Sequence, residues 1–497
     1  MKPQSTVKQE IESPGPFVQP HCRRAAIENV SVAHLSGEWR LSVNVIALII
    51  LGICPNAFSQ APPSGSRRPC EIRALEFEGW KAQEMSNQWL RLTIVPQLGG
   101  RLMQVNFDGH PFLFINPKYK GQYFPPSAAN GQWFNYGGDK IWPMPEGGDD
   151  AQHWPGPVSD ELDDGEYQFN VVSRSPSCTV RLDGPPEPRT GLQYSREITI
   201  SASSPEISFR SIMKNATGHT IRWSMQTVTQ YDTSDRENPK EYNREFWAMT
   251  PLHPQSAYFN KYQVRSGLAD DPSFSAADGM FRLHWLYLEN EVWLDSTAGW
   301  LAVNDAATNY TMVERFQFQA DAEYPGKASL IFYKNGAAAS LDSSGKPVLR
   351  DSTPDEAPYY MEAEINSPMV ELKPGAAYTM KTNWLPVRAA EKIASVTDAG
   401  VIVKPITAMN TGDGVLISGS VGVFFPGKLV VRFESAKGKE LASIDLQSVT
   451  PEVAVELRQT VKVDSRAAKI LVRLVDGDGL DHGILGEAEI QSSPRGF

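Results

Sequence analysis

The feature that most constrains the fold is an alternation of apolar and polar residues with period two, repeated along the chain from about residue 70. Leu90–Val95, Ile207–Met213 and Tyr359–Ile365 alternate in this way. Such alternation is typical of β-strands, whose successive side chains point to opposite faces. Turn-forming clusters such as Leu182–Glu187 and Lys334–Gly336 separate the segments. Because helical periodicity is scarce, we expect an all-β fold of stacked antiparallel sheets.

The pattern changes near residue 388. Arg388–Ser395 could form one short helix, and compact strands with hairpin turns follow. Lys428–Phe433 is followed by a turn at Ser435–Gly438, and Lys469–Val475 by one at Asp476–Gly479. Strands at these intervals over about 100 residues fit a small immunoglobulin-like β-sandwich.

The chain is too long for one ordinary core, so two folded domains are expected. We predict a large β-sandwich domain and a small accessory sandwich, each preceded by a non-globular stretch. The predicted segments are a polar lead with a signal peptide (1–59), a linker (60–71), the large sandwich (72–387), a second linker (388–400) and the small sandwich (401–497).

The N-terminal region has the features of a secretory signal. Arg40 precedes the apolar run Leu41–Leu51, and Ala57–Ser59 has the small-x-small form of a cleavage site. The run is shorter than the about 20 residues that span a bilayer. We therefore expect cleavage before Gln60 and export to the periplasm or beyond, with no membrane span in the mature chain. An uncleaved N-terminal anchor is the alternative.

Cysteine content and charge limit the functions to be considered. Cys70 and Cys178 remain in the mature chain, and export would permit them to pair, although two separate buried thiols fit the sequence equally well. The net charge of −11 repels phosphate backbones, so nucleic-acid binding is not expected. No motif for zinc, a phosphate loop or a Ser/His/Asp hydrolase is present, and we expect no metal and no cofactor.

The densest group of unusual residues is the segment Trp133–Gly147, which continues to Gln152–Gly156. It combines glycines and prolines with tryptophans and the charged or titratable residues Asp139, Lys140 and His153. Sugars bind to such mixtures, because their apolar faces stack on aromatic rings and their hydroxyls take polar partners. The segment is predicted to bind carbohydrate; the alternative is a structural loop pinned by its aromatic residues. The acidic run Asp149 to Asp164 predicts a solvated loop, and a loop that holds a cation is the alternative.

Two further groups of charged residues lie in predicted strands. On a strand, Glu362 and Glu364 would point to one face about 7 Å apart. Two such carboxylates could do acid/base work or could lie on a solvated face. In Met312–Phe316, Glu314 and Arg315 form either a buried ion pair or part of a site.

Residues Pro96–Met103, followed by Asn135–Pro145, resemble an uncharacterised bacterial family of the galactose-mutarotase-like superfamily. The resemblance extends over about residues 72–387. It implies a β-supersandwich fold, which many aldose and hexose-6-phosphate epimerases share with glycosidases, lyases and sugar-binding proteins. Arg101, within the first motif, becomes a candidate for binding substrate.

The resemblance also suggests roles for single residues. Glu362 precedes Leu372–Gly375 as the catalytic glutamate of the relatives does, and His153 resembles their first histidine. Where they have a second histidine this chain has none, and Gln226 or Gln230 faces the right way instead. Glutamine cannot donate a catalytic proton at neutral pH, so the acid would be His153, Lys140 or another donor.

Three hypotheses follow. The first is an aldose 1-epimerase-like enzyme with Glu362 as base and His153 as acid. The second is a non-catalytic carbohydrate-binding or sensing protein, and the third is a hydrolase or lyase that uses the Glu362/Glu364 face. The ligand in each case is a mono- or oligosaccharide, and the oligomeric state stays open. The candidate substrate-binding residues are Arg101, Trp133, Asp139, Lys140, Trp142, Gln226, Gln230, Arg315 and Glu364.

Overall fold

The computed structural model describes residues 70–492 except 130, 149, 151, 338, 342–346, 350–358 and 390. The predicted signal segment lies outside the described residues. The helical elements in the described part are three short 3-10 turns, η1 (Pro117–Tyr119), η2 (Pro126–Ala128) and η3 (Pro325–Lys327). None of the described helices is long and apolar enough to pass through a bilayer. The expectation of an all-β fold is confirmed.

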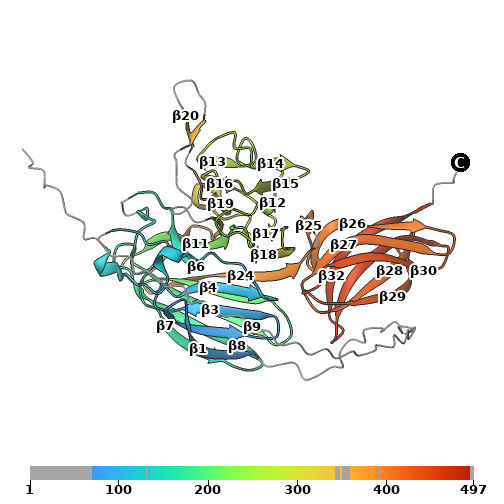
Figure 1. The fold of residues 1–497 in the computed structure, drawn as a ribbon, viewed down its shortest axis with the longest axis horizontal. Helices are drawn as coiled ribbons and strands as arrows, with labels where there is room; N and C mark the ends of the chain where they lie inside the picture. Colours follow the sequence, from blue (N-terminus) through green and yellow to red (C-terminus); the bar gives the residue numbers. More distant parts are fainter. Residues whose placement is uncertain are drawn as a thin grey trace, which may run out of the picture. The chain divides into compact units, whose positions relative to one another are not determined.

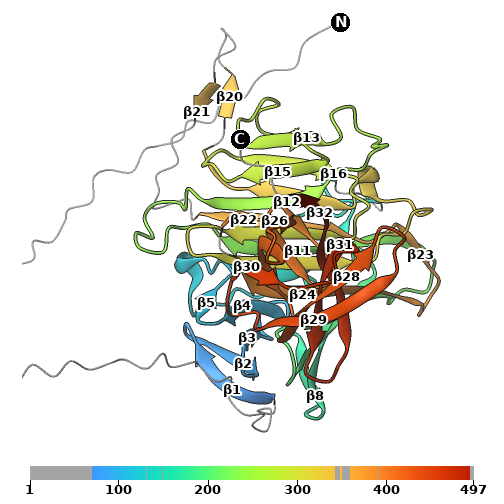
Figure 2. The same cartoon turned by 90° about the vertical axis from the view of Figure 1, so that its right-hand side faces the viewer.

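The first sheet has twelve strands and carries the candidate site (Figure 1). Its main path runs β1-β2-β3-β4-β6-β11-β22-β19-β16-β13, with β5 paired to β4 and β23 to β11. Figure 2 shows β1 to β4 side by side at one edge. The strands are β1 (Glu71–Phe77), β2 (Trp80–Ser86), β3 (Leu90–Val95), β4 (Arg101–Phe107), β5 (His110–Pro111), β6 (Asp139–Met144), β11 (Ile221–Asp232), β13 (Gln263–Ser266), β16 (Asn290–Leu294), β19 (Leu330–Lys334), β22 (Tyr360–Asn366) and β23 (Val370–Leu372).

The second sheet has ten strands in the order β14-β15-β12-β17-β18-β24-β10-β9-β8-β7. Buried residues of both sheets, among them Leu92, Ile198 and Phe209, form one hydrophobic core, as in a β-sandwich. The strands are β7 (Gln168–Ser173), β8 (Ser177–Pro186), β9 (Leu192–Ser201), β10 (Ile207–Asn215), β12 (Phe246–Pro251), β14 (Phe274–Ala277), β15 (Met280–His284), β17 (Trp300–Asp305), β18 (Tyr310–Phe316) and β24 (Ala377–Arg388). A separate pair joins β20 (Ala339–Leu341) to β21 (Pro347–Leu349).

The C-terminal strands form an eight-stranded sheet with a hydrophobic core of its own. The two hairpins expected from the sequence are confirmed, one between β28 and β29 and the other between β31 and β32. β26 and β32 pair in parallel, whereas the other pairings described within this sheet are antiparallel. The strands are β25 (Ser395–Val396), β26 (Gly400–Asn410), β27 (Val415–Val423), β28 (Gly427–Ser435), β29 (Glu440–Val449), β30 (Val455–Val461), β31 (Ala467–Asp476) and β32 (Asp481–Ser492).

Two local predictions are wrong. The expected turn at Leu182–Glu187 is mostly strand, because β8 continues to Pro186 past an irregularity after Asp183. The possible helix at 388–395 is absent from its described residues. Ala389 and Ile393 are instead buried in a cluster with Leu385 and Val401, and burial of these side chains outweighs a weak helix propensity.

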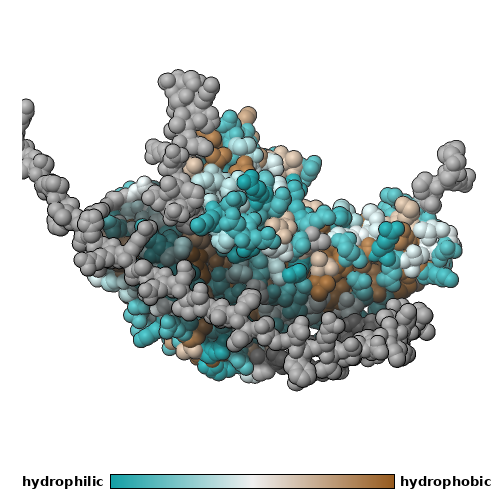
Figure 3. All heavy atoms as spheres, in the orientation of Figure 1, coloured by the Kyte–Doolittle hydropathy of each residue, from teal (hydrophilic) through white to brown (hydrophobic). Residues whose placement is uncertain are grey.

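Large exposed apolar side chains are scattered rather than gathered. Among the described residues they are the neighbours Val171 and Val172 of β7 and, each on a different element, Phe259, Met409, Val453 and Leu480. Hydrophilic residues cover much of the face shown in Figure 3. Isolated apolar residues of this kind are normal on a protein surface.

Cys70 and Cys178 form a disulfide with a Cα–Cα distance of 5.8 Å, so the pairing left open by the sequence is present. The bond closes a loop of 108 residues between the first strand of one sheet and β8 of the other. Cys70→Ser is expected to lower the free energy of unfolding by about 2–4 kcal/mol, because the unfolded chain regains the freedom of that loop. Urea unfolding of wild type and variant, each with and without reductant, measures the change. Equal stability of the two proteins without reductant would contradict this expectation.

Candidate functional site

The candidate site lies where β6, β11 and β22 run side by side in the first sheet. The strand register places Gln226 opposite Trp142, and Gln230 opposite Glu362. Val228 lies between Lys140 and Glu364. Since successive side chains alternate between faces, one face of the three strands carries Lys140 and Trp142, Gln226 and Gln230, and Glu362 and Glu364. The other face contributes Met225, Met361 and Ile365 to the core.

Each glutamate of β22 is held by an amide of β11. Gln230 donates its Nε2 hydrogen bond to Glu362 Oε1, and Gln226 donates to Glu364 Oε2, each over 2.5 Å. Lys140 Nζ lies 3.6 Å from Glu362 Oε1. The carbonyl oxygens of both glutamines are buried and accept no hydrogen bond from any described residue. Buried polar atoms without partners are rare in folded proteins, and here two of them lie directly behind the glutamates of β22.

Carboxylates and aromatic rings converge on a cavity of about 220 Å³. Both predicted glutamates line it, together with Trp133 and Trp142 from the glycine- and proline-rich segment. The full lining is Trp133, Trp142, Glu146, Pro157, Glu291, Tyr333, Tyr360, Glu362 and Glu364.

The close packing of these carboxyl groups changes their acidity. Burial, and next the charge of Glu362, raise the pKa of Glu364 well above its ordinary value. Burial and the neighbouring Glu291 raise the pKa of Glu146 to about 8. Burial lowers the pKa of Lys140, while the adjacent Glu362 opposes that change. Groups that share a site but differ in protonation are the usual basis of acid/base catalysis.

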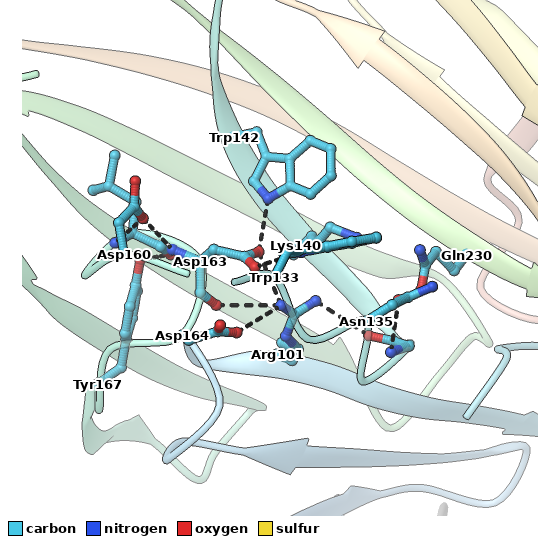
Figure 4. A network of polar contacts seen from close by, with 12 residues as sticks. Arg101, Trp133, Asn135, Lys140, Trp142, Asp160, Asp163, Asp164, Tyr167 and Gln230 are labelled. Atoms are coloured by element: carbon cyan, nitrogen blue, oxygen red, sulfur yellow. Dashed lines mark hydrogen bonds and ion pairs between the residues drawn. The ribbon is translucent and has the colours of Figure 1, made fainter. Parts of the chain in front are cut away.

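The two tryptophans of the cavity are fixed from behind by one carboxylate (Figure 4). Asp163 accepts hydrogen bonds from Trp133 Nε1 over 3.0 Å and from Trp142 Nε1 over 2.7 Å. Arg101 Nη2 pairs with Asp163 at 2.8 Å and with Asp164 at 3.1 Å, and all three side chains are fully buried. The prediction of a solvated acidic loop is therefore wrong for Asp163 and Asp164, because the guanidinium compensates their burial. Arg101 does not line the cavity, and its contacts support the aromatic wall.

Asp139 points away from the cavity, although it is adjacent to Lys140 in the sequence. Its carboxylate pairs with Arg196 of the second sheet and accepts a hydrogen bond from Thr229 Oγ1 over 3.0 Å. Neighbouring residues of a strand face opposite sides, which explains why the structure brings Lys140 to the site but not Asp139.

Glu314 and Arg315 do not pair with each other. Tyr231 donates to Glu314 Oε1 over 2.6 Å within the core. Arg315 donates to the carbonyl oxygen of Thr397 and lies 3.5 Å from Asp398. Neither residue lines the cavity.

His153 belongs to Gln152–Gly156, the continuation of the glycine- and proline-rich segment, and it too lies outside the cavity lining. Its side chain is 43% exposed, and Nδ1 lies 2.9 Å from Asp150. The structure thus brings together Glu362, Glu364, Trp133 and Trp142 at the cavity, with Lys140, Gln226 and Gln230 directly behind them.

Sequence reasoning missed four important residues of the lining, Glu146, Glu291, Tyr333 and Tyr360. Glu146 could have been predicted from the sequence, because it belongs to the unusual segment Trp133–Gly147. Glu291 and Tyr333 come from β16 and β19, which join the site only through long-range pairing with β22. No local signal distinguishes them from residues of a solvated strand face.

The buried carboxyl group of Glu314, which lies away from the cavity, is expected to make the stability of the protein depend on pH. Burial raises its pKa to about 8, above the about 4.3 of an unfolded chain. The folded state therefore keeps a proton that the unfolded state releases, and this contribution to stability is lost as pH rises from about 4.3 through 8. Glu314→Gln cannot ionise, so its free energy of unfolding is expected to fall less than that of wild type between pH 5 and pH 8, by on the order of a few kcal/mol. Urea unfolding at both pH values measures this, with the exposed Glu371→Gln as control; equal changes in all three proteins would refute it.

Comparisons with known proteins return only distant structural similarity. No protein-family model matches the chain, and no curated protein does. Among solved structures, a putative mutarotase from Salmonella typhimurium is 10% identical with a TM-score of 0.41, over 64% of this chain and 94% of that one. A putative aldose 1-epimerase from Escherichia coli K12 is 11% identical with a TM-score of 0.36, over 64% and 99%.

A third similar structure is longer than the matched region. A TPR-domain containing protein from Parabacteroides distasonis is 14% identical with a TM-score of 0.40, over 62% of this chain. The match spans 47% of that protein. At these values no activity passes from the neighbours to this chain, and the architecture described above is established by its own sheets and their pairing.

Proposed function

We propose that this is an exported protein that binds a carbohydrate in the 220 Å³ cavity and interconverts its anomers by acid/base catalysis. The observation that carries the proposal is the convergence of Glu362 and Glu364 with the rings of Trp133 and Trp142 on one cavity. Flat rings suit the apolar face of a sugar, and the carboxylates suit its hydroxyls.

In the proposed reaction Glu362 is the base. It takes the proton of the anomeric hydroxyl, the electron pair of the O1–H bond forms the C1=O1 double bond, and the bond between C1 and the ring oxygen breaks with its electron pair moving to that oxygen. The ring oxygen leaves with the proton of an acid. Rotation about the C1–C2 bond and reversal of these steps give the other anomer, and atoms and charges balance without a co-reactant.

Glu364 is the best-placed acid. Burial and the charge of Glu362 raise its pKa well above the ordinary value, which favours the protonated form, and it lines the same cavity as Glu362. Alternate residues on a strand lie about 7 Å apart, which leaves a hemiacetal centre room between the two groups. Lys140 and Gln230 hold Glu362 in place. His153 has no part in this proposal, since it lies outside the cavity lining.

Export is supported by two observations. The sequence carries the signal-like segment before Gln60, and the Cys70–Cys178 disulfide fits an oxidising compartment. N-terminal sequencing of protein recovered from the periplasm of a bacterial host is expected to start at Gln60. Recovery of the intact chain in the membrane fraction would favour the uncleaved anchor.

The reaction is tested by NMR exchange spectroscopy of anomeric protons, with D-glucose, D-galactose and D-mannose and purified protein. Faster exchange for at least one sugar supports the proposal. Calorimetric binding without faster exchange would instead identify a carbohydrate-binding protein. Release of reducing ends from polysaccharides would identify a hydrolase or lyase.

A further inference from the structure

A second, larger cavity of about 910 Å³ adjoins the candidate site. Its lining includes Phe114, Asn116, Tyr119, Trp133, Asn135 and Tyr359. Trp133 lines both cavities, so they are neighbours at this residue. None of the roles proposed above uses this second space.

The two cavities also share a stacked pair of rings. Phe114 of the large cavity and Tyr360 of the small one lie 5.0 Å apart between centroids, with an angle of 18° between their planes. Tyr359 and Tyr360 are consecutive residues, and each lines a different cavity. The two cavities therefore lie next to each other along a row of aromatic side chains.

The polar groups of the large cavity suit hydroxyls rather than a charged ligand. Asn116 and Asn135 each use Oδ1 to accept a backbone hydrogen bond, and their Nδ2 groups donate to no described residue. Of the three charged side chains in the lining, two are paired, and the third, Lys118, places its Nζ 5.3 Å from the centroid of the Tyr119 ring. Lys120 lies 3.0 Å from Glu78, and Asp232 lies 2.9 Å from Arg236. A neutral ligand with many hydroxyls fits this combination of rings and amides.

The volumes of the two cavities indicate how the sugar rings of the ligand are distributed between them. The small cavity, at about 220 Å³, is below the roughly 300–1,000 Å³ of ordinary ligand pockets, whereas the large one, at about 910 Å³, is near the top of that range. We propose that the substrate is a neutral oligosaccharide with its reducing-terminal ring in the small cavity and the preceding rings in the large one. This inference rests on the proposed function, because only the reducing terminus has a free anomeric centre.

The test compares chain lengths. Anomer exchange at the reducing end is measured for maltotetraose, cellotetraose and mannotetraose against D-glucose and D-mannose. For at least one series kcat/KM of the tetrasaccharide is expected to exceed that of its monosaccharide by about tenfold or more, because contacts with remote rings stabilise the transition state. If monosaccharides are converted and no tetrasaccharide is faster, this inference fails while the proposed function stands. If no sugar is converted at all, both fail.

A substitution tests the location of the extra rings. Pro239 is exposed and lines only the large cavity, so Pro239→Trp would fill part of it. The ratio of tetrasaccharide to monosaccharide kcat/KM is expected to fall towards one. Pro188→Trp, at an exposed proline outside both linings, is the matched control and should keep the wild-type ratio. An unchanged ratio in Pro239→Trp would overturn the proposal.

Discussion

Glu362→Gln is expected to slow anomer exchange by about 10²–10⁴-fold, the usual contribution of a general base. The amide has nearly the same shape but cannot accept the hydroxyl proton. Gln230 can still donate to the remaining Oε1, so the side chain keeps its place. The NMR exchange assay measures the rate, and calorimetry measures sugar affinity, which is expected to change far less than the rate.

Two controls make this result specific to catalysis. Glu371→Gln makes the same chemical change on the exposed face of β23 and should keep the wild-type rate. Because Glu362→Gln also removes the counter-charge of the buried Lys140, its folding is verified by near-UV circular dichroism before rates are compared. A folded Glu362→Gln protein with a rate near wild type would rule out Glu362 as the base.

Arg101→Met is expected to lower the free energy of unfolding by about 3–5 kcal/mol, as does removal of one partner from other buried ion pairs. The loss arises because Asp163 and Asp164 would keep their burial without a compensating charge. Burial already raises the pKa of Asp164 to about 8 despite the guanidinium. Urea unfolding measures the change.

A compensated variant separates charge from packing. Arg101→Met combined with Asp163→Asn and Asp164→Asn removes every ionisable group of the cluster, so no buried charge is left uncompensated and much of the lost stability is expected to return. If the triple variant is as unstable as Arg101→Met alone, shape rather than charge explains the loss. If Arg101→Met unfolds like wild type, the buried cluster contributes nothing to stability.

The period-two pattern was sufficient to predict the sheets and to place several site residues correctly on their strands. Gln226 and Gln230 fall on one face by simple alternation, as do Glu362 and Glu364, and the structure confirms that these faces meet. The alternation could also have separated Asp139 from Lys140. The glycine- and proline-rich surroundings of Asp139 and Lys140 favour a loop, however, and only the structure shows that both belong to β6.

The remaining site residues depend on pairing over long distances in the sequence. Glu291 reaches the cavity only because β16 pairs with β19 and β19 with β22. A shift of one residue in either register would turn its side chain to the core. Arg101 was predicted to touch the ligand, and only the fold shows that Asp163 lies between it and the two tryptophans.

The shared hydrogen-bond acceptor behind Trp133 and Trp142 affects how tightly a sugar can bind. Ordering a mobile side chain at an interface costs roughly 0.5–1.5 kcal/mol. Asp163 holds both indoles through their Nε1 atoms without a ligand, so that entropy is lost during folding rather than at the moment of binding. For two rings this preserves about 1–3 kcal/mol of affinity, or roughly a tenfold to hundredfold lower dissociation constant than mobile rings would allow.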